Sequence, residues 1–513
     1  MTAISNLNVR GRTWPLVAAL VAAGCLSRLP QLLSHNLLLE GDECILGLMG
    51  MHVAAGREFP WFFYGQKYGL AIVEAPAAAL AFGLFGAGAA SLKIAMLAVW
   101  LAGVCAYFLA FSRVLGVKRS FCLTLILVLM PAWGAASMKA WSGYITAFTL
   151  TGVALCLVAR NERPGLASWA AAGATSVAIY FAHPLWMPGL LPIVLWFLIG
   201  SRRPSAWIAY AAAALAAVAF MVLLESYWLA GMAEAWTRPA AGNPDLLGSL
   251  PRLWSQIHVN FTGAYYFGTP LRTGPVTSIV AGAWLAVLAV LCALQIYRLV
   301  TRQFLAWSHL LFLSVLATLA ANWVLLDWRD ARYVLAMNAP LAFLGGVEFF
   351  DLADRHRLSF RARAAVLVVV LALQAVALIE FARLTDMWWT NPPGTPSEAR
   401  TLARVIGGLR ARGVTRVYTM NALLQWQVTF YSHEEVIARW KAPRDRYPRY
   451  ITTVDRALNR GEPVALVGYA GYTYGFERVV PDPESIEVID GKYFVYVGVT
   501  AEQLRRAGFS IGD

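Results

Sequence analysis

Charged residues are scarce in this chain, and cysteine chemistry is missing from it. Only 14% of the 513 residues are charged, whereas 59% are hydrophobic. The six cysteines show no CxxC spacing, and none follows residue 381, so the sequence implies neither a disulfide framework nor a cysteine metal site. The polar C-terminal part also lacks a glycine-rich phosphate fingerprint and a catalytic-triad signature. No motif in the C-terminal part therefore indicates an active site of its own.

Long apolar stretches are what the sequence has in abundance. A helix needs about 20 apolar residues to cross the hydrocarbon core, and several stretches meet this length, such as 364–381. The stretches are continuous rather than alternating, which favours helices over a barrel. The first, 14–33, lacks a small-residue cleavage pattern and is interpreted as a retained signal anchor. The sequence predicts a polytopic α-helical membrane protein.

The net charge is +13, and many of the basic residues lie in the connections between these stretches. We therefore attribute the charge to membrane topology and predict no nucleic-acid partner. Five short connections are basic: Arg113, Lys118 and Arg119; Arg160 and Arg163; Arg202 and Arg203; Arg298 and Arg302; and Arg355, Arg357, Arg361 and Arg363. By the positive-inside rule these face the cytoplasm. The alternate connections and the segment after residue 381 then face outward. We expect a bacterial inner-membrane protein whose active site and C-terminal domain lie on the periplasmic side.

One apolar stretch conflicts with this topology. Asp42 lies outside and Arg113 inside, yet the two stretches 69–85 and 90–111 separate them. The first contains Glu74 and a proline, so we interpret residues 69–86 as an outer-surface or re-entrant helix. About eleven spans result, and the competing count is twelve or thirteen.

The composition divides the chain into three parts. A transmembrane module is predicted for 1–382, with a first outer loop at 35–89. A proline-rich linker, 383–396, leads into a small α/β domain at 397–513. In this domain we expect helices at 397–412 and 450–460 and strands at 414–420, 436–440 and 463–470. Its cations alternate with aromatics in one segment that contains Arg439, Lys441, Arg444, Arg446 and Arg449. We interpret the segment as a solvated, membrane-proximal face; the alternative is contact with anionic headgroups or a phosphorylated acceptor.

The first outer loop carries the acidic pair Asp42-Glu43. Ionised side chains near the hydrocarbon boundary cost free energy unless they face water, a partner or a substrate. A helix ending in glycine follows, then an aromatic stretch, an apolar helix closing with Leu84-Phe85-Gly86, and a basic linker after the next span. Arg332-Tyr333, followed by Pro340, begins a late span. From residue 14 to about residue 350 this order resembles the GT-C glycosyltransferase superfamily. It is most similar to families 39 and 83, which include protein O-mannosyltransferases and lipid A aminoarabinose transferases.

The resemblance implies an inverting transfer of a sugar from a polyprenyl-phosphate donor to a glycolipid, polysaccharide or protein on the outer face. Asp42 would be the general base and Glu43 a neighbour that orients it. The donor phosphate would meet Lys67, Arg332 and Tyr333. Lys67 has a second interpretation as an interfacial lysine that reaches water, and Arg332 as a helix-end anchor.

Three further residues are candidates for lining a cavity that faces the substrate: Glu74, Lys139 and His183. Glu74, an acid inside an apolar helix, would pair with Lys67. His183 precedes a proline that breaks two spans, so a capping role is the competing interpretation. No metal ligands are assigned. A divalent ion remains open, because some relatives use one with a second pair of acids that this chain does not show.

Two other function classes remain. A transporter or flippase for a lipid-linked saccharide would explain the spans, although the matching interrupted segments of inverted repeats are missing. A non-enzymatic assembly scaffold would leave Asp42 dispensable.

Overall fold

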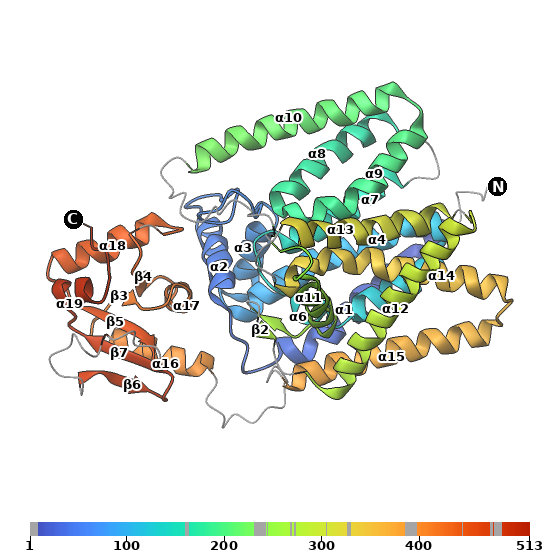
Figure 1. Cartoon of the computed structure of the whole chain (residues 1–513). Coiled ribbons are helices and arrows are strands. Elements are labelled where there is room, and N and C mark those ends of the chain that lie inside the picture. The colour runs from blue at the N-terminus through green and yellow to red at the C-terminus, as the bar shows by residue number, and fades with distance from the viewer. Residues whose placement is uncertain are drawn as a thin grey trace.

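The computed structural model describes residues 9–159, 164–229, 243, 245–266, 269–270, 273–303, 305–325, 330–384, 398–443, 445–471, 476 and 485–512. A bundle of helices fills most of the chain, and a small domain of sheet and helices follows it. Figure 1 shows this domain beside α2 and α3, at one end of the bundle. The connections α9–α10, α12–α13 and α14–α15, which carry basic residues, lie together at the opposite end.

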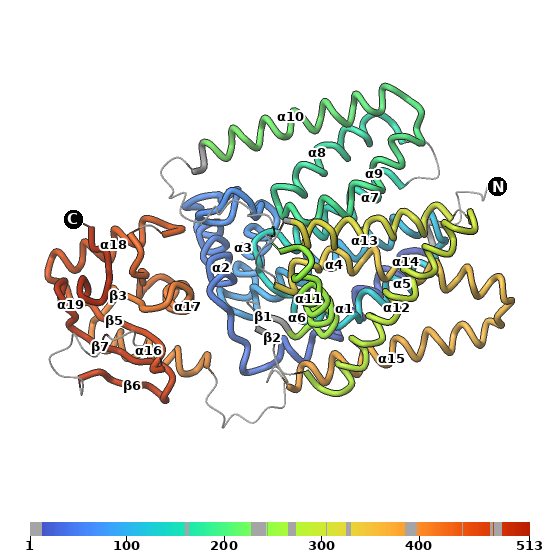
Figure 2. Tube along the Cα trace, in the orientation of Figure 1, coloured from blue at the N-terminus to red at the C-terminus, as the bar shows by residue number. Residues whose placement is uncertain are grey.

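The bundle and its loops contain these helices and strands: α1 Val9–Leu32, α2 Gly41–Ala54, α3 Glu74–Phe85, α4 Ala89–Leu115, α5 Val117–Leu129, α6 Trp133–Ala136, α7 Tyr144–Val158, α8 Leu166–Ala182, η1 Pro184–Trp186, α9 Met187–Ser201, α10 Pro204–Leu229, α11 Leu250–Thr262, β1 Tyr265–Tyr266, β2 Thr269–Pro270, α12 Pro275–Val300, α13 Ala306–Leu325, η2 Ala331–Met337, α14 Asn338–Arg355 and α15 Phe360–Leu384. Figure 2 traces how α8 lies along α10, and α12 along α15.

Within the described residues, eight helices are long and apolar enough to cross a membrane: α1, α4, α9 with η1, α10, α12, α13, α14 with η2, and α15. Three shorter apolar helices, α3, α7 and α8, accompany them. The polytopic helical fold is confirmed. The prediction of about eleven spans did not count residues 69–86; without α3, the eight long helices and the shorter α7 and α8 make ten within the described residues.

The first outer loop folds into α2 and α3. With 12 residues, α3 is about 18 Å long, well short of the roughly 30 Å hydrocarbon core. It packs against α2 at Gly50, where a Cβ would lie 2.7 Å from that of Ala78. The length of α3 agrees with the surface or re-entrant helix expected for residues 69–86.

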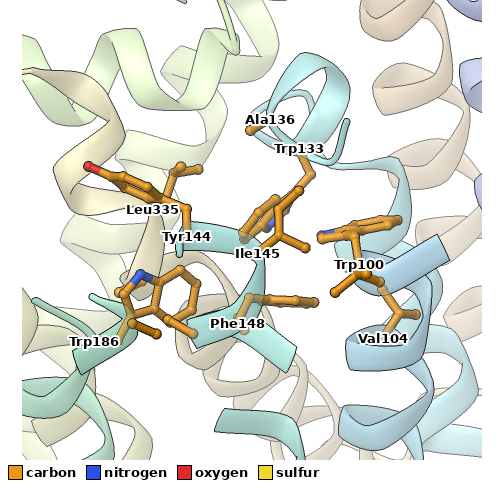
Figure 3. Close-up of a cluster of buried hydrophobic side chains, with 14 of the residues drawn as sticks. Trp100, Val104, Trp133, Ala136, Tyr144, Ile145, Phe148, Trp186 and Leu335 are labelled. Carbon is orange, nitrogen blue, oxygen red and sulfur yellow. The ribbon is translucent and has the colours of Figure 1, made fainter. Parts of the chain in front are cut away.

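Large aromatic side chains fill the centre of the bundle (Figure 3). Phe148 of α7 stacks on Trp100 of α4, with ring centroids 6.0 Å apart, and lies 4.7 Å from the ring of Trp133. Trp186 joins them from η1. Arg28 of α1 is buried beside this cluster, with its guanidinium over Trp100. It donates to the Val128 carbonyl near the end of α5, to the Trp133 carbonyl at the start of α6, and to the Ser137 hydroxyl directly after α6. These contacts hold the loop after α6 in place.

The C-terminal domain comprises α16 Glu398–Ala411, β3 Arg416–Thr419, α17 Leu424–Tyr431, β4 Ile437–Trp440, α18 Pro448–Asn459, β5 Val464–Tyr469, β6 Glu487–Ile489, β7 Tyr493–Val497 and α19 Ala501–Arg506. The sheet order is β4-β3-β5-β7-β6, with β3 parallel to β4 and β5, and β7 antiparallel to its neighbours. Successive strand residues face opposite layers: Val417 packs with α16 and α17, whereas Tyr418 packs with α18 and α19.

The two helices and three strands expected in this domain are present, each within two residues of its predicted bounds. The sequence interpretation missed α17, β6, β7 and α19. The predicted linker lies outside the described residues apart from its first two positions. The division into domains stays a prediction in its exact boundaries.

Glycines allow α17 to approach α2 closely. A Cβ at position 41 would lie 2.7 Å from that of Leu423, and one at position 47 would overlap the ring of Phe430. Phe430 and Trp426 belong to the same hydrophobic cluster as the bundle. The C-terminal domain is therefore packed onto the first outer loop through a shared core.

The basic segment of this domain is not uniformly solvated, which corrects part of the sequence interpretation. Arg439 is buried and forms a two-point ion pair with Asp455, with N–O distances of 2.7 and 2.6 Å. Tyr418 also donates to Asp455, at 2.9 Å. Arg439 holds β4 against α18, whereas Arg444 lies outside the described residues.

Replacing Asp455 with Asn should destabilise the C-terminal domain by about 3–5 kcal/mol, because the Arg439 guanidinium would stay buried without its counter-charge. Thermal unfolding followed by limited proteolysis of this domain measures the effect. The control is Glu502→Gln, which removes an exposed ion pair with Arg506 and should change the unfolding temperature little. An Asp455→Asn protein as stable as the control would contradict this role of the pair.

Candidate functional site

A buried group of four charges fixes the start of α2. Glu43 accepts from Lys139 at 3.1 Å, from the Ala140 amide at 3.2 Å, and from Lys93. Glu40 pairs with Lys139 at 3.5 Å and accepts from an indole N–H. Two carboxylates and two ammonium groups balance in charge, and their hydrogen bonds offset part of the cost of removing them from water. The group joins α2 to α4 and to the loop after α6.

Asp42 lies within this anchored turn but has different surroundings. Its side chain is 17% exposed, whereas that of Glu43 is completely buried. Its Oδ1 lies 3.3 Å from a guanidinium nitrogen of Arg446, which belongs to the C-terminal domain. Of the predicted acidic pair, Asp42 is therefore the partly exposed residue. A catalytic role for Glu43 stays a prediction, and its observed contacts position the helix.

Arg332 occupies the start of η2, above two aromatic rings. Its guanidinium carbon lies 5.5 Å from the ring centroid of Trp141 and 5.5 Å from that of Tyr333. Asp330 is 3.4 Å away and accepts from the backbone N–H of Arg332, which caps η2. This arrangement holds the cation rigidly while leaving its side chain 17% exposed.

Aromatic residues connect Arg332 with Asp42. The Arg332 guanidinium lies over the ring of Trp141, whose indole N–H donates to Glu40, the residue that caps the α2 turn carrying Asp42. The ring of His183 lies 4.0 Å from that of Tyr144 and 6.5 Å from that of Tyr68.

His183 is buried, and its Nδ1 has no hydrogen-bond partner within the described residues. A buried polar atom without a partner is costly, and a bound ligand is one way to satisfy it. The predicted cavity-lining role of His183 is thus compatible with its surroundings, as is the capping role, since the residue ends α8.

The predicted pair between Glu74 and Lys67 is wrong. Glu74 is buried at the start of α3 and accepts from the N–H and hydroxyl of Thr146, both at 3.0 Å. Lys67 instead pairs with Glu225 of α10 at 3.2 Å. These hydrogen bonds to the Glu74 carboxylate join α3 to the start of α7, which is a structural role. Lys67 stays a candidate phosphate ligand at the edge of the site.

A second polar network joins the first outer loop to the C-terminal domain. His52 of α2 contacts Glu58 through Nδ1 at 2.8 Å and Glu434 through Nε2 at 3.0 Å. Glu434 also pairs with Arg57 and accepts from Tyr450, the latter at 2.7 Å. These side chains lie between α2 and the domain and connect the two by charge as well as by packing.

Sequence reasoning missed several of these residues. Lys93 carried a signal, because it is an ionisable residue inside the apolar stretch 90–111. Arg446 was assigned to a solvated face, with contact to anionic headgroups or a phosphorylated acceptor as the alternative, and its contact with Asp42 depends on how the domain docks. Within the described part of the chain, no group of three or more His, Cys, Asp or Glu side chains gathers that could hold a metal ion.

Comparison with known proteins identifies the fold. No protein-family model matches the chain, and no curated protein matches its sequence. Among solved structures, ArnT from Cupriavidus metallidurans, bound to undecaprenyl phosphate, is 13% identical; the match covers 96% of this chain and 99% of that one, with a TM-score of 0.55. An oligosaccharyltransferase from Archaeoglobus fulgidus, in complex with Zn and sulfate, is 11% identical over 90% of this chain and 69% of its own, with a TM-score of 0.51.

The docking network should depend on pH. Burial lowers the pKa of His52, but its hydrogen bonds to Glu434 and Glu58 outweigh this and raise the pKa above 6.5. Burial acts to raise the pKa of Glu434, whereas its bonds with His52, Arg57 and Tyr450 lower it to about 2. The His52 contribution is complete below about pH 6.5 and is lost as the pH rises through its raised pKa; that of Glu434 is lost only in strong acid.

We therefore expect α2 and α17 to exchange amide hydrogen more slowly at pH 6 than at pH 8.5, after correction for intrinsic rates. His52→Gln keeps hydrogen-bonding groups but does not titrate over this range, so it should remove the difference between the two pH values. Equal protection of the wild-type protein at both pH values would disprove the coupling.

Proposed function

The chain has the fold of the GT-C glycosyltransferases, and from this premise we propose that it transfers a sugar from a polyprenyl-phosphate donor to an acceptor hydroxyl. The observation that carries the proposal is the position of Asp42. Its side chain is 17% exposed and sits on a helix turn fixed by buried charges, and Trp141 joins that turn, through Glu40, to the guanidinium of Arg332. A base and a cation on a rigid frame are what this reaction needs.

In the proposed reaction, Asp42 accepts the proton of the acceptor hydroxyl. The acceptor oxygen forms its bond to the anomeric carbon while the bond from that carbon to the phosphate oxygen breaks. The bonding electron pair stays on the phosphate oxygen, and polyprenyl phosphate is the leaving group. Attack on the face opposite the leaving group inverts the anomeric configuration.

Arg332 is the cation best placed for the departing phosphate. A guanidinium is always charged and can donate two parallel hydrogen bonds to phosphate oxygens. Its contacts with the rings of Trp141 and Tyr333 keep the charge in position before the reaction. Such preorganised charge is usually the largest catalytic contribution. Lys67 would add a second charge at the edge. The ArnT structure, which contains undecaprenyl phosphate, supports a polyprenyl phosphate ligand for this fold.

The end of the bundle that carries Asp42 and the C-terminal domain would face outward. The basic connections α9–α10, α12–α13 and α14–α15 lie at the opposite end (Figure 1), where the positive-inside rule places the cytoplasm. The proposed setting is the outer face of a bacterial inner membrane, with a lipid, glycan or protein as acceptor.

Replacing Asp42 with Asn should lower turnover by about 10² to 10⁴, since the base is lost while the donor site remains. Native mass spectrometry of the detergent-purified protein identifies the bound lipid and so detects the unreacted donor that this loss of turnover leaves behind. The Asp42→Asn protein should retain a sugar-bearing polyprenyl phosphate, and the wild-type protein the bare lipid phosphate.

Asp354→Asn is the matched control, because Asp354 pairs with Arg119 and Arg363 at the basic end of the bundle. It should give the wild-type spectrum. Identical spectra from wild type and Asp42→Asn would reject Asp42 as the base and favour a transporter or a scaffold.

A further inference from the structure

Arg446 brings a charge from the C-terminal domain to the proposed reaction centre. We propose that this domain is a working part of the site, with Arg446 as the positioning residue that holds Asp42 in its reactive orientation. The inference rests on the proposed function and deepens it, because it assigns a task to a domain that carries no catalytic motif of its own.

The approach of the Arg446 segment to the first outer loop is built into both chain segments. Gly65 has a φ of +67°, and a Cβ there would lie 2.7 Å from the Cα of Arg446. Any side chain at position 65 would push the two backbones apart. The turn that presents Arg446 therefore rests directly on the loop that follows α2.

The Arg446 side chain is held from several directions. Its guanidinium contacts Oδ1 of Asp42 at 3.3 Å and lies over the ring of Phe63, 5.3 Å from the centroid. Its backbone N–H donates to Oδ1 of the neighbouring buried Asp445 at 2.7 Å. Only 14% of the Arg446 side chain is exposed. A cation with this little freedom restricts the carboxylate that it contacts.

The burial of this pair separates it from ordinary surface ion pairs of the domain. In the pair of Arg506 with Glu502 the two side chains are 63% and 71% exposed, so water screens the attraction. The corresponding exposures of Arg446 and Asp42 are 14% and 17%. Reduced contact with water strengthens the attraction between them, and the pair spans two parts of the chain that only docking brings together.

A base in an acyl or glycosyl transfer acts only when its oxygen lies in line with the proton it accepts, and a misplacement of about 1 Å can cost a hundredfold in rate. Asp42 is in the first turn of α2, where its backbone is fixed but its side chain can adopt other rotamers. The guanidinium selects one of them.

The test compares the full-length wild-type protein with Asp42→Asn, Arg446→Gln and Arg449→Gln by native mass spectrometry of co-purified lipid. Arg449 is the matched control: it is exposed in the same segment and packs on Tyr447 rather than on Asp42. Arg446→Gln should lower turnover about a hundredfold and accumulate the same sugar-bearing lipid phosphate as Asp42→Asn, although its Asp42 is intact. Arg449→Gln should give the wild-type spectrum.

The outcomes distinguish this inference from the proposed function. Accumulation on Asp42→Asn with a wild-type spectrum from Arg446→Gln would overturn the positioning role and leave the proposed function standing. Loss of all lipid from Arg446→Gln would make Arg446 a donor ligand instead, and would also overturn it. Absence of a sugar-bearing lipid from both variants would remove the proposed function, and the inference with it.

Arg446→Lys keeps the test decisive if the glutamine variant does not fold. A lysine retains the charge but not the planar group that contacts Asp42 while lying over Phe63, so the sugar-bearing fraction should fall between wild type and Asp42→Asn. A wild-type fraction on Arg446→Lys would then reject the requirement for a guanidinium against Asp42.

Discussion

The buried charge group of Glu40, Glu43, Lys93 and Lys139 is the constraint on which the site depends. It lies where the first outer loop meets α4 and the loop after α6, and it joins segments from three parts of the chain. Because each charge has an opposite partner, the start of α2 cannot shift without exposing an unpaired charge in a dry environment. This cost makes α2 a rigid base for the accessible carboxylate at its second position.

A second constraint is the close packing of the C-terminal domain on α2. The glycines at positions 41, 47 and 65 remove the side chains that would keep the two apart, and aromatic residues of the domain enter the hydrophobic cluster of the bundle. The network around His52 then adds charge pairs to this packing. The docked domain covers one side of α2. Arg332 is connected to the start of α2 through Trp141, which donates to Glu40. The site thus has parts from the bundle, the loop and the domain.

The regular elements followed from local patterns. Apolar stretches of about 20 residues predict spans because an unpaired backbone in hydrocarbon is costly, and the alternation of helix and strand patterns located five elements of the C-terminal domain. The short helix α17 was missed since its eight residues are nearly all buried, which leaves no amphipathic period to detect. The pairing of Lys67 with Glu74 also failed, because sequence proximity does not tell which way a side chain points; α10 supplied the actual partner.

The sequence by itself determined that this is a multi-pass helical membrane protein with a small α/β domain, and it singled out Asp42 and Arg332, because composition, hydropathy and short motifs are local properties. Only the tertiary structure decided that Glu43 is buried while Asp42 is accessible, and that Arg446 meets Asp42. These facts depend on which distant segments pack together. A single sequence does not encode that packing in any short pattern, since the contacts arise from complementary shape and charge across the whole fold.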